Sequence, residues 1–166
     1  MARQYFGTDG IRGRVNTPPM TAESALRLAI AAARTFAPNG GREVVIGRDT
    51  RRSGQMIEAA LIAGLTSMGL KPVLLGIVPT PTVALMTRET GAALGLMVSA
   101  SHNKSDDNGI KLFSPAGIKL TDAEEEALEA AMASAFEGDF APPPAIATPH
   151  HMNGAIALYL ERCLET

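Results

Sequence analysis

Gly-Leu-Met-Val-Ser-Ala-Ser-His-Asn, residues 95–103, is an apolar run that ends in small and polar side chains. This pattern is typical of a buried strand that delivers reactive groups to the edge of a sheet. A hydroxyl beside an imidazole, as at Ser101 and His102, suits a nucleophile next to a proton relay or phosphate ligand. The stretch lacks the Gly-x-Ser-x-Gly pattern of hydrolases, and Lys111 follows within residues 107–113. A serine, a histidine and a lysine near one strand end favour phosphoryl transfer over acyl transfer.

Strand and helix signals alternate on both sides of this stretch. We therefore expect an α/β domain of three layers, in which a mixed, mainly parallel sheet of about four strands lies between helices. Residues 1–140 are predicted to form this domain, and residues 141–166 a proline-rich linker with a final helix. Strands are predicted at 43–47, 71–76, 95–99 and 110–113 (the last in a hairpin with 118–120), and residues 5–16 are expected to form a short strand or an extended loop. Helices are predicted at 21–36, 55–68, 82–89, 121–136 and 152–164, and a turn at Asp106, Asp107 and Asn108.

The composition argues against several classes of protein. Hydrophobic residues make up 46% of the 166, which is enough for a core, and aromatics only 4%, so that core is aliphatic. The net charge of -2 gives no reason to expect binding to nucleic acid or acidic lipid. One cysteine, Cys163, allows no internal disulfide and favours a reducing compartment. No apolar run approaches the roughly 18 residues of a membrane span, so we expect a cytoplasmic protein.

Three blocks of the sequence resemble signatures of the α-D-phosphohexomutase superfamily. Residues 99–103 with 107–111 (Ser-Ala-Ser-His-Asn and Asp-Asn-Gly-Ile-Lys) resemble its phosphoserine loop. Tyr-Phe-Gly-Thr-Asp-Gly-Ile-Arg-Gly, residues 5–13, resembles its N-terminal signature, and Gly-Arg-Asp-Thr-Arg-Arg-Ser-Gly, residues 47–54, a third. Within the superfamily, the last two blocks are most similar to those of the phosphoglucosamine mutase family. The resemblance covers nearly the whole chain from Tyr5.

The resemblance implies roles for five residues. Ser101 matches the serine that is phosphorylated in the resting enzymes, and His102 is expected to contact the phosphate or move a proton. Arg12 and Lys111 match cations near the transferring phosphate, which stabilise charge or assist deprotonation of the sugar hydroxyl. Asn103, in the same loop, is expected to help bind the phosphate.

Three questions stay open at the level of sequence. Ser99 shares a face with Ser101 if the strand continues, and only the family pattern selects Ser101 as the phosphoryl carrier. Asp49, Arg51 and Arg52 could bind an anion at the start of the following helix, or they could fix the Ser101 loop through ion pairs. Asp9 could orient Arg12 or cap the turn.

The resemblance also implies the partners of a complete enzyme. They are a phosphosugar substrate, glucosamine 1,6-bisphosphate as activator and intermediate, the remaining domains of the enzyme and, in a homodimer, a second copy. One Mg²⁺ would be held through the phosphate on Ser101 and three aspartates of a loop that these residues do not contain. Residues 141–166 would lead to an absent second domain, so the 166 residues alone are expected to be inactive. The alternatives are a phosphomannomutase or phosphoglucomutase domain, and a free-standing binding module without catalysis.

Overall fold

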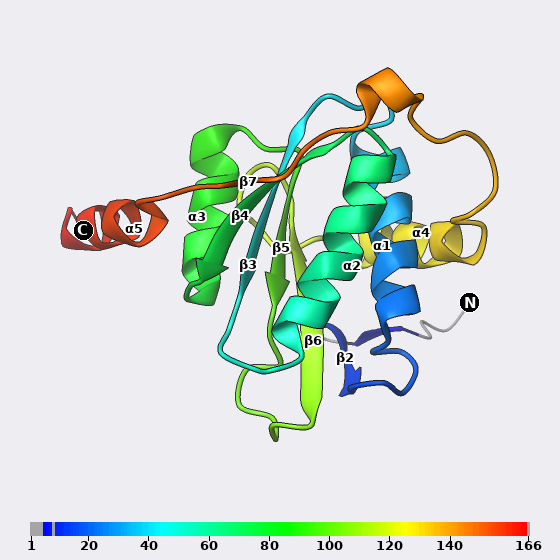
Figure 1. Ribbon diagram of the computed structural model, residues 1–166. Coiled ribbons are helices and arrows are strands. Elements are labelled where there is room, and N and C mark those ends of the chain that lie inside the picture. The colour runs from blue at the N-terminus through cyan, green and yellow to red at the C-terminus, as the bar shows by residue number, and fades with distance from the viewer. Residues whose placement is uncertain (1–4, 8, 166) are drawn as a thin grey trace.

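The computed structural model describes residues 5–7 and 9–165, so Thr8 of the first signature and Thr166 lie outside the described residues. A mixed sheet with the strand order β1-β2-β6-β5-β3-β4-β7 lies between helices (Figure 1). Its strands are β1 (Phe6–Gly7), β2 (Gly10–Arg14), β3 (Glu43–Arg48), β4 (Lys71–Ile77), β5 (Leu94–Val98), β6 (Asp107–Phe113) and β7 (His150–His151). The helices are α1 (Ala22–Phe36), α2 (Gly54–Ser67), α3 (Thr80–Thr90), α4 (Asp122–Ala133) and α5 (Ala155–Leu164), with a 3₁₀ turn, η1 (Pro143–Ala145).

The layered α/β fold is confirmed, but the sheet of the described residues has seven strands where about four were expected. The four predicted strands are present as β3 to β6. The others are the hairpin of β1 and β2 and the two-residue β7, which pairs with β4 in parallel. Strands of two residues have no periodicity, so only pairing with distant residues defines them. Residues 118–120 form an isolated bridge between Lys119 and Phe113 in place of a second hairpin strand.

The two halves of the sheet differ in direction, and this difference positions the site. Strands β5, β3, β4 and β7 are parallel, whereas β1, β2 and β6 pair antiparallel. Arg48 and Val98, the last residues of β3 and β5, are register partners. The loops 49–53 and 99–106 therefore leave the sheet at the same edge, where open α/β sheets bind ligands.

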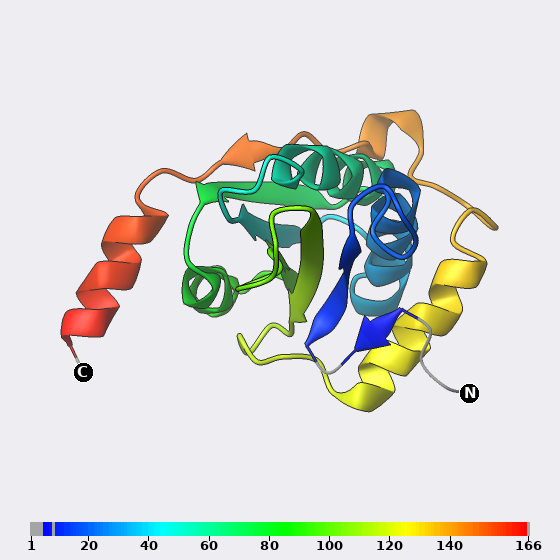
Figure 2. The ribbon, with the colours of Figure 1, turned by 90° about the horizontal axis from the view of Figure 1, so that it is seen from below.

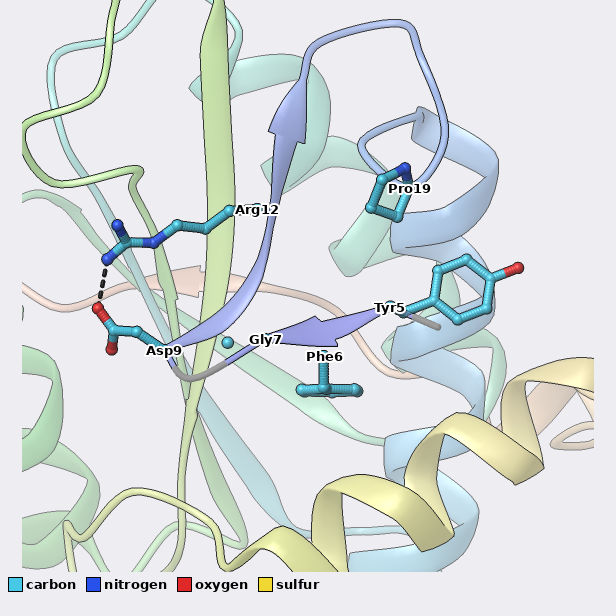
Figure 3. Close-up of a pocket in the computed structure, with 7 residues that line it drawn as sticks. Tyr5, Phe6, Gly7, Asp9, Arg12 and Pro19 are labelled. Atoms are coloured by element: carbon cyan, nitrogen blue, oxygen red, sulfur yellow. Dashed lines mark hydrogen bonds and ion pairs between the residues drawn. The ribbon is translucent and has the colours of Figure 1, made fainter. Parts of the chain in front are cut away.

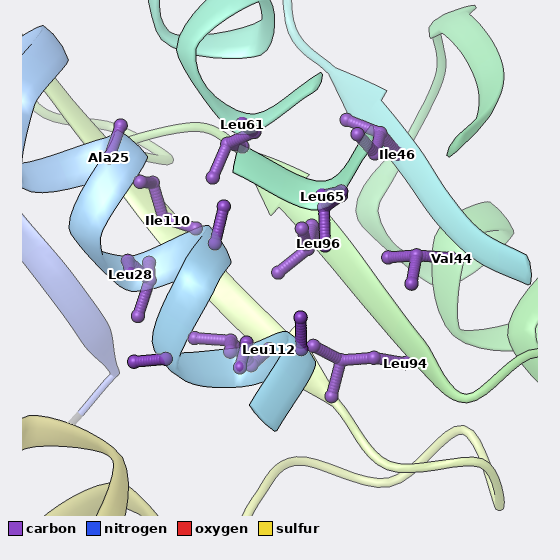
Figure 4. Packing of buried hydrophobic residues seen from close by; sticks show 14 of the residues in the cluster. Ala25, Leu28, Val44, Ile46, Leu61, Leu65, Leu94, Leu96, Ile110 and Leu112 are labelled. Atoms are coloured by element: carbon purple, nitrogen blue, oxygen red, sulfur yellow. The ribbon is translucent and has the colours of Figure 1, made fainter. Parts of the chain in front are cut away.

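Helices cover the two faces of the sheet, and side chains alternate between them. Val44 and Ile46 pack with α1 and α2, as Figure 4 shows, whereas Val45 packs with residues of α3. Helix α4 packs against α1 in the first of these layers, and α5 lies outside α3 (Figure 2). Helix α1 begins at the predicted cap, because Thr21 Oγ1 accepts the Ser24 N–H at 3.1 Å.

Candidate functional site

Ser101 lies three residues beyond the end of β5, at the edge where the parallel strands end. Its side chain is exposed, and its Oγ is 3.4 Å from Nδ1 of His102, which is also exposed. The φ angle of Ser101 is +58°, in the left-handed region that residues other than glycine seldom adopt. The predicted nucleophile and its imidazole neighbour therefore lie together on the surface, on a constrained backbone.

Ser99 has a different environment from Ser101, and this difference separates the two candidate serines. Ser99 is buried, and its Oγ donates to Asp49 Oδ2 at 2.7 Å. The same Oγ accepts the Ser101 N–H at 3.0 Å. A hydroxyl has one hydrogen to donate, and that of Ser99 is used. Of the two serines, only Ser101 offers an exposed hydroxyl.

Arg51 uses all five of its guanidinium N–H donors to hold the Ser101 loop. Its Nε donates to Asp49 Oδ2 at 3.1 Å, and the Asp49 Oδ1 accepts the Arg51 backbone N–H at 3.0 Å. The other four donors reach carbonyl oxygens of the loop that follows β5 and of the first residue of β6. These oxygens belong to Lys104 (2.5 Å), Asp107 (3.0 Å), Ser101 (3.1 Å) and Asn103 (2.8 Å). Asp49 and Arg51 therefore fix the loop, which is the second of the two roles that the sequence left open.

Asn103 makes contacts within the same loop. Its Nδ2 donates to Asp107 Oδ2 at 3.1 Å, and its backbone N–H donates to the Ala100 carbonyl at 3.1 Å. The described contacts of Asn103 stabilise the turn after Ser101, and its role in phosphate binding stays a prediction.

Asn108 supports the site, although the sequence placed it in a turn. It is fully buried within β6, opposite Gly13 of β2. Its Nδ2 donates to Ser53 Oγ at 2.8 Å, and its Oδ1 accepts the Gly109 N–H at 2.8 Å. The turn prediction holds for Asp106 but was wrong for Asp107 and Asn108, which begin β6. Asn108 can be buried in the strand because both ends of its amide are paired inside the fold, which removes the cost of burial. The available signal was the Asn-Gly pair directly before the apolar strand pattern of residues 110–113.

Arg12 and Lys111 form a second cluster around Asp9. Lys111 Nζ lies 2.8 Å from Asp9 Oδ2, and the same oxygen pairs with Arg12. The hydrogen bond from Lys111 lowers the pKa of Asp9 below its ordinary value; partial burial opposes this shift, and the charges of Lys111 and Arg12 reinforce it. One carboxylate thus pairs with both cations that the family resemblance places near the transferring phosphate.

Strand geometry explains why Arg12 and Lys111 lie on the same face. Ile110 packs in the core with α1 and α2, so alternation turns its neighbour Lys111 to the opposite face. Arg12 is the register partner of Gly109 on the neighbouring strand. If residue 109 had a Cβ, that atom would lie 3.0 Å from Arg12 Cγ and 2.7 Å from the Ser99 carbonyl oxygen. Glycine at position 109 therefore lets the Arg12 side chain lie close to the backbone of β6.

An open pocket of about 450 Å³ adjoins this cluster. Figure 3 shows Arg12 and Asp9 on one side of the β1–β2 hairpin and Tyr5 and Pro19 on the other. The pocket is lined by Tyr5, Phe6, Gly7, Asp9, Gly10, Arg12 and Pro19.

The predicted site residues thus form two groups. Arg12 and Lys111 meet through Asp9, and Ser101, His102 and Asn103 share the loop held by Arg51. The backbone connects the two groups, because the Ser99 N–H donates to the Gly109 carbonyl at 2.9 Å.

Two further features are absent from residues 5–7 and 9–165. No helix there has the length and apolar character needed to cross a membrane. No three histidine, cysteine, aspartate or glutamate side chains of that part of the chain form a group that could hold a metal ion.

Comparison with known proteins identifies the family. Residues 3–139 match the family model "phosphoglucomutase/phosphomannomutase, alpha/beta/alpha domain I". The chain belongs to this family. It is 74% identical over all its 166 residues to a phosphoglucosamine mutase of Hyphomonas neptunium, and 51% identical over 170 aligned positions to one of Dinoroseobacter shibae. In both comparisons the whole chain is covered, and it spans 37% of the relative's length.

Solved structures of this family share the fold. A structure from Thermus thermophilus, named as a phosphomannomutase, superimposes with a TM-score of 0.77 at 34% identity. The match covers 93% of this chain and 34% of that one. The recognition of the phosphohexomutase fold from three sequence blocks is confirmed, and the family implies a divalent metal in the complete enzymes.

Proposed function

We propose that this chain is the N-terminal, phosphoserine-carrying domain of a phosphoglucosamine mutase, an enzyme that interconverts glucosamine 6-phosphate and glucosamine 1-phosphate. The observation that carries the proposal is the exposed Ser101 hydroxyl, whose Oγ lies 3.4 Å from His102 Nδ1, on a loop in which Ser99 is committed to Asp49. The names of the relatives at 74% and 51% identity support the choice of glucosamine phosphates over other hexose phosphates.

The proposed reaction has two phosphoryl transfers, both through Ser101. In the first, the Ser101 Oγ–P bond breaks, a bond forms between that phosphorus and O1 of glucosamine 6-phosphate, and the O1 proton is returned to Oγ. In the second, the 1,6-bisphosphate has turned round. An Oγ–P bond then forms to its 6-phosphate, the P–O6 bond breaks, and the Oγ proton moves to O6. The products are glucosamine 1-phosphate and phosphorylated Ser101, so the enzyme is regenerated.

The chain's own residues assist these transfers through charge and proton movement. His102 Nδ1, at 3.4 Å from Ser101 Oγ, is the group placed to relay the proton. Arg12 and Lys111 supply fixed positive charge for the phosphoryl oxygens, and guanidinium groups bind phosphate in a bidentate way. The incoming phosphate would replace the Asp9 carboxylate as the anion shared by these two cations.

The family implies a metal ion, and the described residues show whether this chain could hold that ion by itself. As no metal-ligand cluster occurs in residues 5–7 and 9–165, that part of the chain does not form a complete Mg²⁺ site. We propose that its contribution is a single ligand, the phosphate on Ser101. The steps proposed for this chain's own residues therefore do not involve the metal.

The final helix is consistent with a domain of a longer enzyme. Ile156, Leu160 and Leu164 recur at every fourth position of α5 and are 47%, 54% and 88% exposed. Such a stripe on one helix face is typical of a surface that another element covers. We propose that residues 1–140 form the body of the first domain and that residues 141–166, which add β7 at the edge of its sheet, lead towards the next. Metal, sugar selection and the distal phosphate contact would come from the other domains, so these 166 residues alone should not complete the two-transfer cycle on glucosamine 6-phosphate, although Ser101 can still accept a single phosphate.

Phosphate uptake tests the proposal directly. The chain is incubated with glucosamine 1,6-bisphosphate and Mg²⁺, and intact mass is measured. We expect a gain of about 80 Da, the mass of one phosphate, with release of an equal amount of glucosamine monophosphate. The Ser101→Ala variant should gain nothing, whereas Ser105→Ala, at an exposed serine of the same loop, should behave as wild type. A folded wild-type chain that gains no phosphate, or a Ser101→Ala variant that gains one, would contradict the proposal.

A further inference from the structure

A closed ring of hydrogen bonds fixes the backbone on both sides of Ser101. The Ser101 N–H donates to Ser99 Oγ at 3.0 Å, and the Ser101 carbonyl accepts from Arg51 Nη2 at 3.1 Å. Ser99 Oγ and Arg51 Nε both donate to one atom, Asp49 Oδ2, at 2.7 and 3.1 Å. A single carboxylate oxygen on the β3 loop therefore connects the hydrogen bonds on both peptide groups of Ser101.

This ring acts on a residue whose conformation is unfavourable by itself. Ser101 has a φ of +58°, which a residue with a Cβ adopts at a cost in free energy. Such conformations persist only where the surroundings determine them, and they cluster at functional sites. The direction of the Ser101 Cα–Cβ bond follows from its two peptide planes, so the ring also sets the direction in which the Ser101 side chain leaves the backbone.

We propose that Asp49, Ser99 and Arg51 form a positioning unit that holds Ser101 in the left-handed conformation from which its hydroxyl accepts a phosphoryl group. None of the three touches the phosphorus; each acts through the backbone of Ser101. The inference rests on the proposed function for its phosphoryl half. Its structural half, that Ser99 and Asp49 hold the Ser101 peptide, stands on the hydrogen bonds alone.

The variants separate positioning from general stability. Ser99→Ala opens the ring at one bond, and Ser99→Thr keeps a hydroxyl at the same place. Asp49→Asn keeps the shape of the side chain but removes the charge that receives two donors. Ser67→Ala is the matched control, because Ser67 Oγ also makes a side-chain bond to a backbone group, the Gly64 carbonyl at 2.8 Å, away from this loop.

Two readouts are compared on the whole chain. The first is the rate of phosphate gain from glucosamine 1,6-bisphosphate, which should fall at least about tenfold in Ser99→Ala and Asp49→Asn, since small misplacements of a reacting group have effects of this size. Ser99→Thr should stay within about threefold of wild type, and Ser67→Ala should not change. The second is hydrogen exchange of the Ser101 amide, which should lose protection in Ser99→Ala while the core amides of β3 and β5 keep theirs.

Two results would overturn the inference. The first is an unchanged rate of phosphate gain together with unchanged Ser101 exchange in Ser99→Ala. The second is an equal loss of that rate in Ser99→Ala and Ser67→Ala. If Ser99→Ala does not fold, Asp49→Asn compared with Ser99→Thr gives the same test. A wild-type chain that takes no phosphate would contradict the proposed function and the phosphoryl half of the inference, whereas the exchange result would still decide whether Ser99 holds the Ser101 peptide.

Discussion

Replacing Arg51 with methionine should lower the free energy of unfolding by about 3 kcal/mol. The Arg51 side chain is 11% exposed and makes five hydrogen bonds. Three of them, to Asp49, Asp107 and Asn103, are partly buried, and each is worth about 1 kcal/mol net. The two to Ser101 and Lys104 are exposed, so water replaces the lost donors there at little cost. Methionine keeps the length and apolar character of the side chain, so the loss is assigned to the hydrogen bonds.

Urea denaturation followed by circular dichroism measures this change, and thermal unfolding checks it. For a chain of this size, about 3 kcal/mol corresponds to a fall in melting temperature of about 6–12 °C. Arg34→Met is the matched control, because Arg34 also donates to two carbonyls, at 3.3 and 3.4 Å, but both bonds are exposed. It should cost less than about 1 kcal/mol. Equal losses in the two variants, or a loss below about 1 kcal/mol for Arg51→Met, would refute the reasoning.

Three further changes have defined outcomes. The hydrogen bond from Lys111 lowers the pKa of Asp9, so this carboxylate adds stability above its ordinary pKa that is lost as the pH falls through the lowered one. The difference in melting temperature between wild type and Asp9→Asn should therefore be constant above about pH 5 and shrink below about pH 4, and a difference that grows on acidification would oppose this. Gly109→Ala should cost about 1–3 kcal/mol in urea denaturation, because its Cβ would lie 2.7 and 2.8 Å from two backbone oxygens, whereas Gly7→Ala, with 3.7 Å of clearance, should cost less. Thr121→Ala should cost about 1 kcal/mol by the same assay through loss of the α4 capping box, and no loss would contradict that role for the cap.

The parts of the fold that the sequence predicted are those with a local physical signal. The β-branched run at 43–47 and the apolar run at 95–99 are read from a few adjacent residues, and both strands are present. The strand β7, by contrast, consists of two exposed histidines that pair with β4. Nothing in the residues around His150 indicates a strand, because its pairing with Val73 joins segments 77 residues apart. The β1–β2 hairpin was predicted only in part, as a short strand or an extended loop over residues 5–16, because its first strand has two residues and its register depends on pairing.

The candidate site likewise has parts with a local sequence signal and parts that depend on pairing between distant residues. The motif at 99–103 identified the loop and its reactive groups, but it could not choose between Ser99 and Ser101. The choice depends on Asp49, which lies 50 residues away and becomes a partner of Ser99 only through the parallel pairing of β3 and β5. The sequence left open whether Asp9 orients Arg12 or caps a turn, because its position between Arg12 and Lys111 follows from strand register and from glycine at position 109.

The central claim, that Ser101 is the phosphoryl carrier, is tested most directly by locating the phosphate. The chain is treated with glucosamine 1,6-bisphosphate and Mg²⁺, digested, and the peptide containing residues 99–105 is fragmented in a mass spectrometer. This peptide holds three serines, and we predict that the phosphate is on Ser101 alone, since Ser99 Oγ is committed to Asp49. Phosphate on Ser99 or Ser105, or an unmodified peptide from a folded chain, would contradict the account.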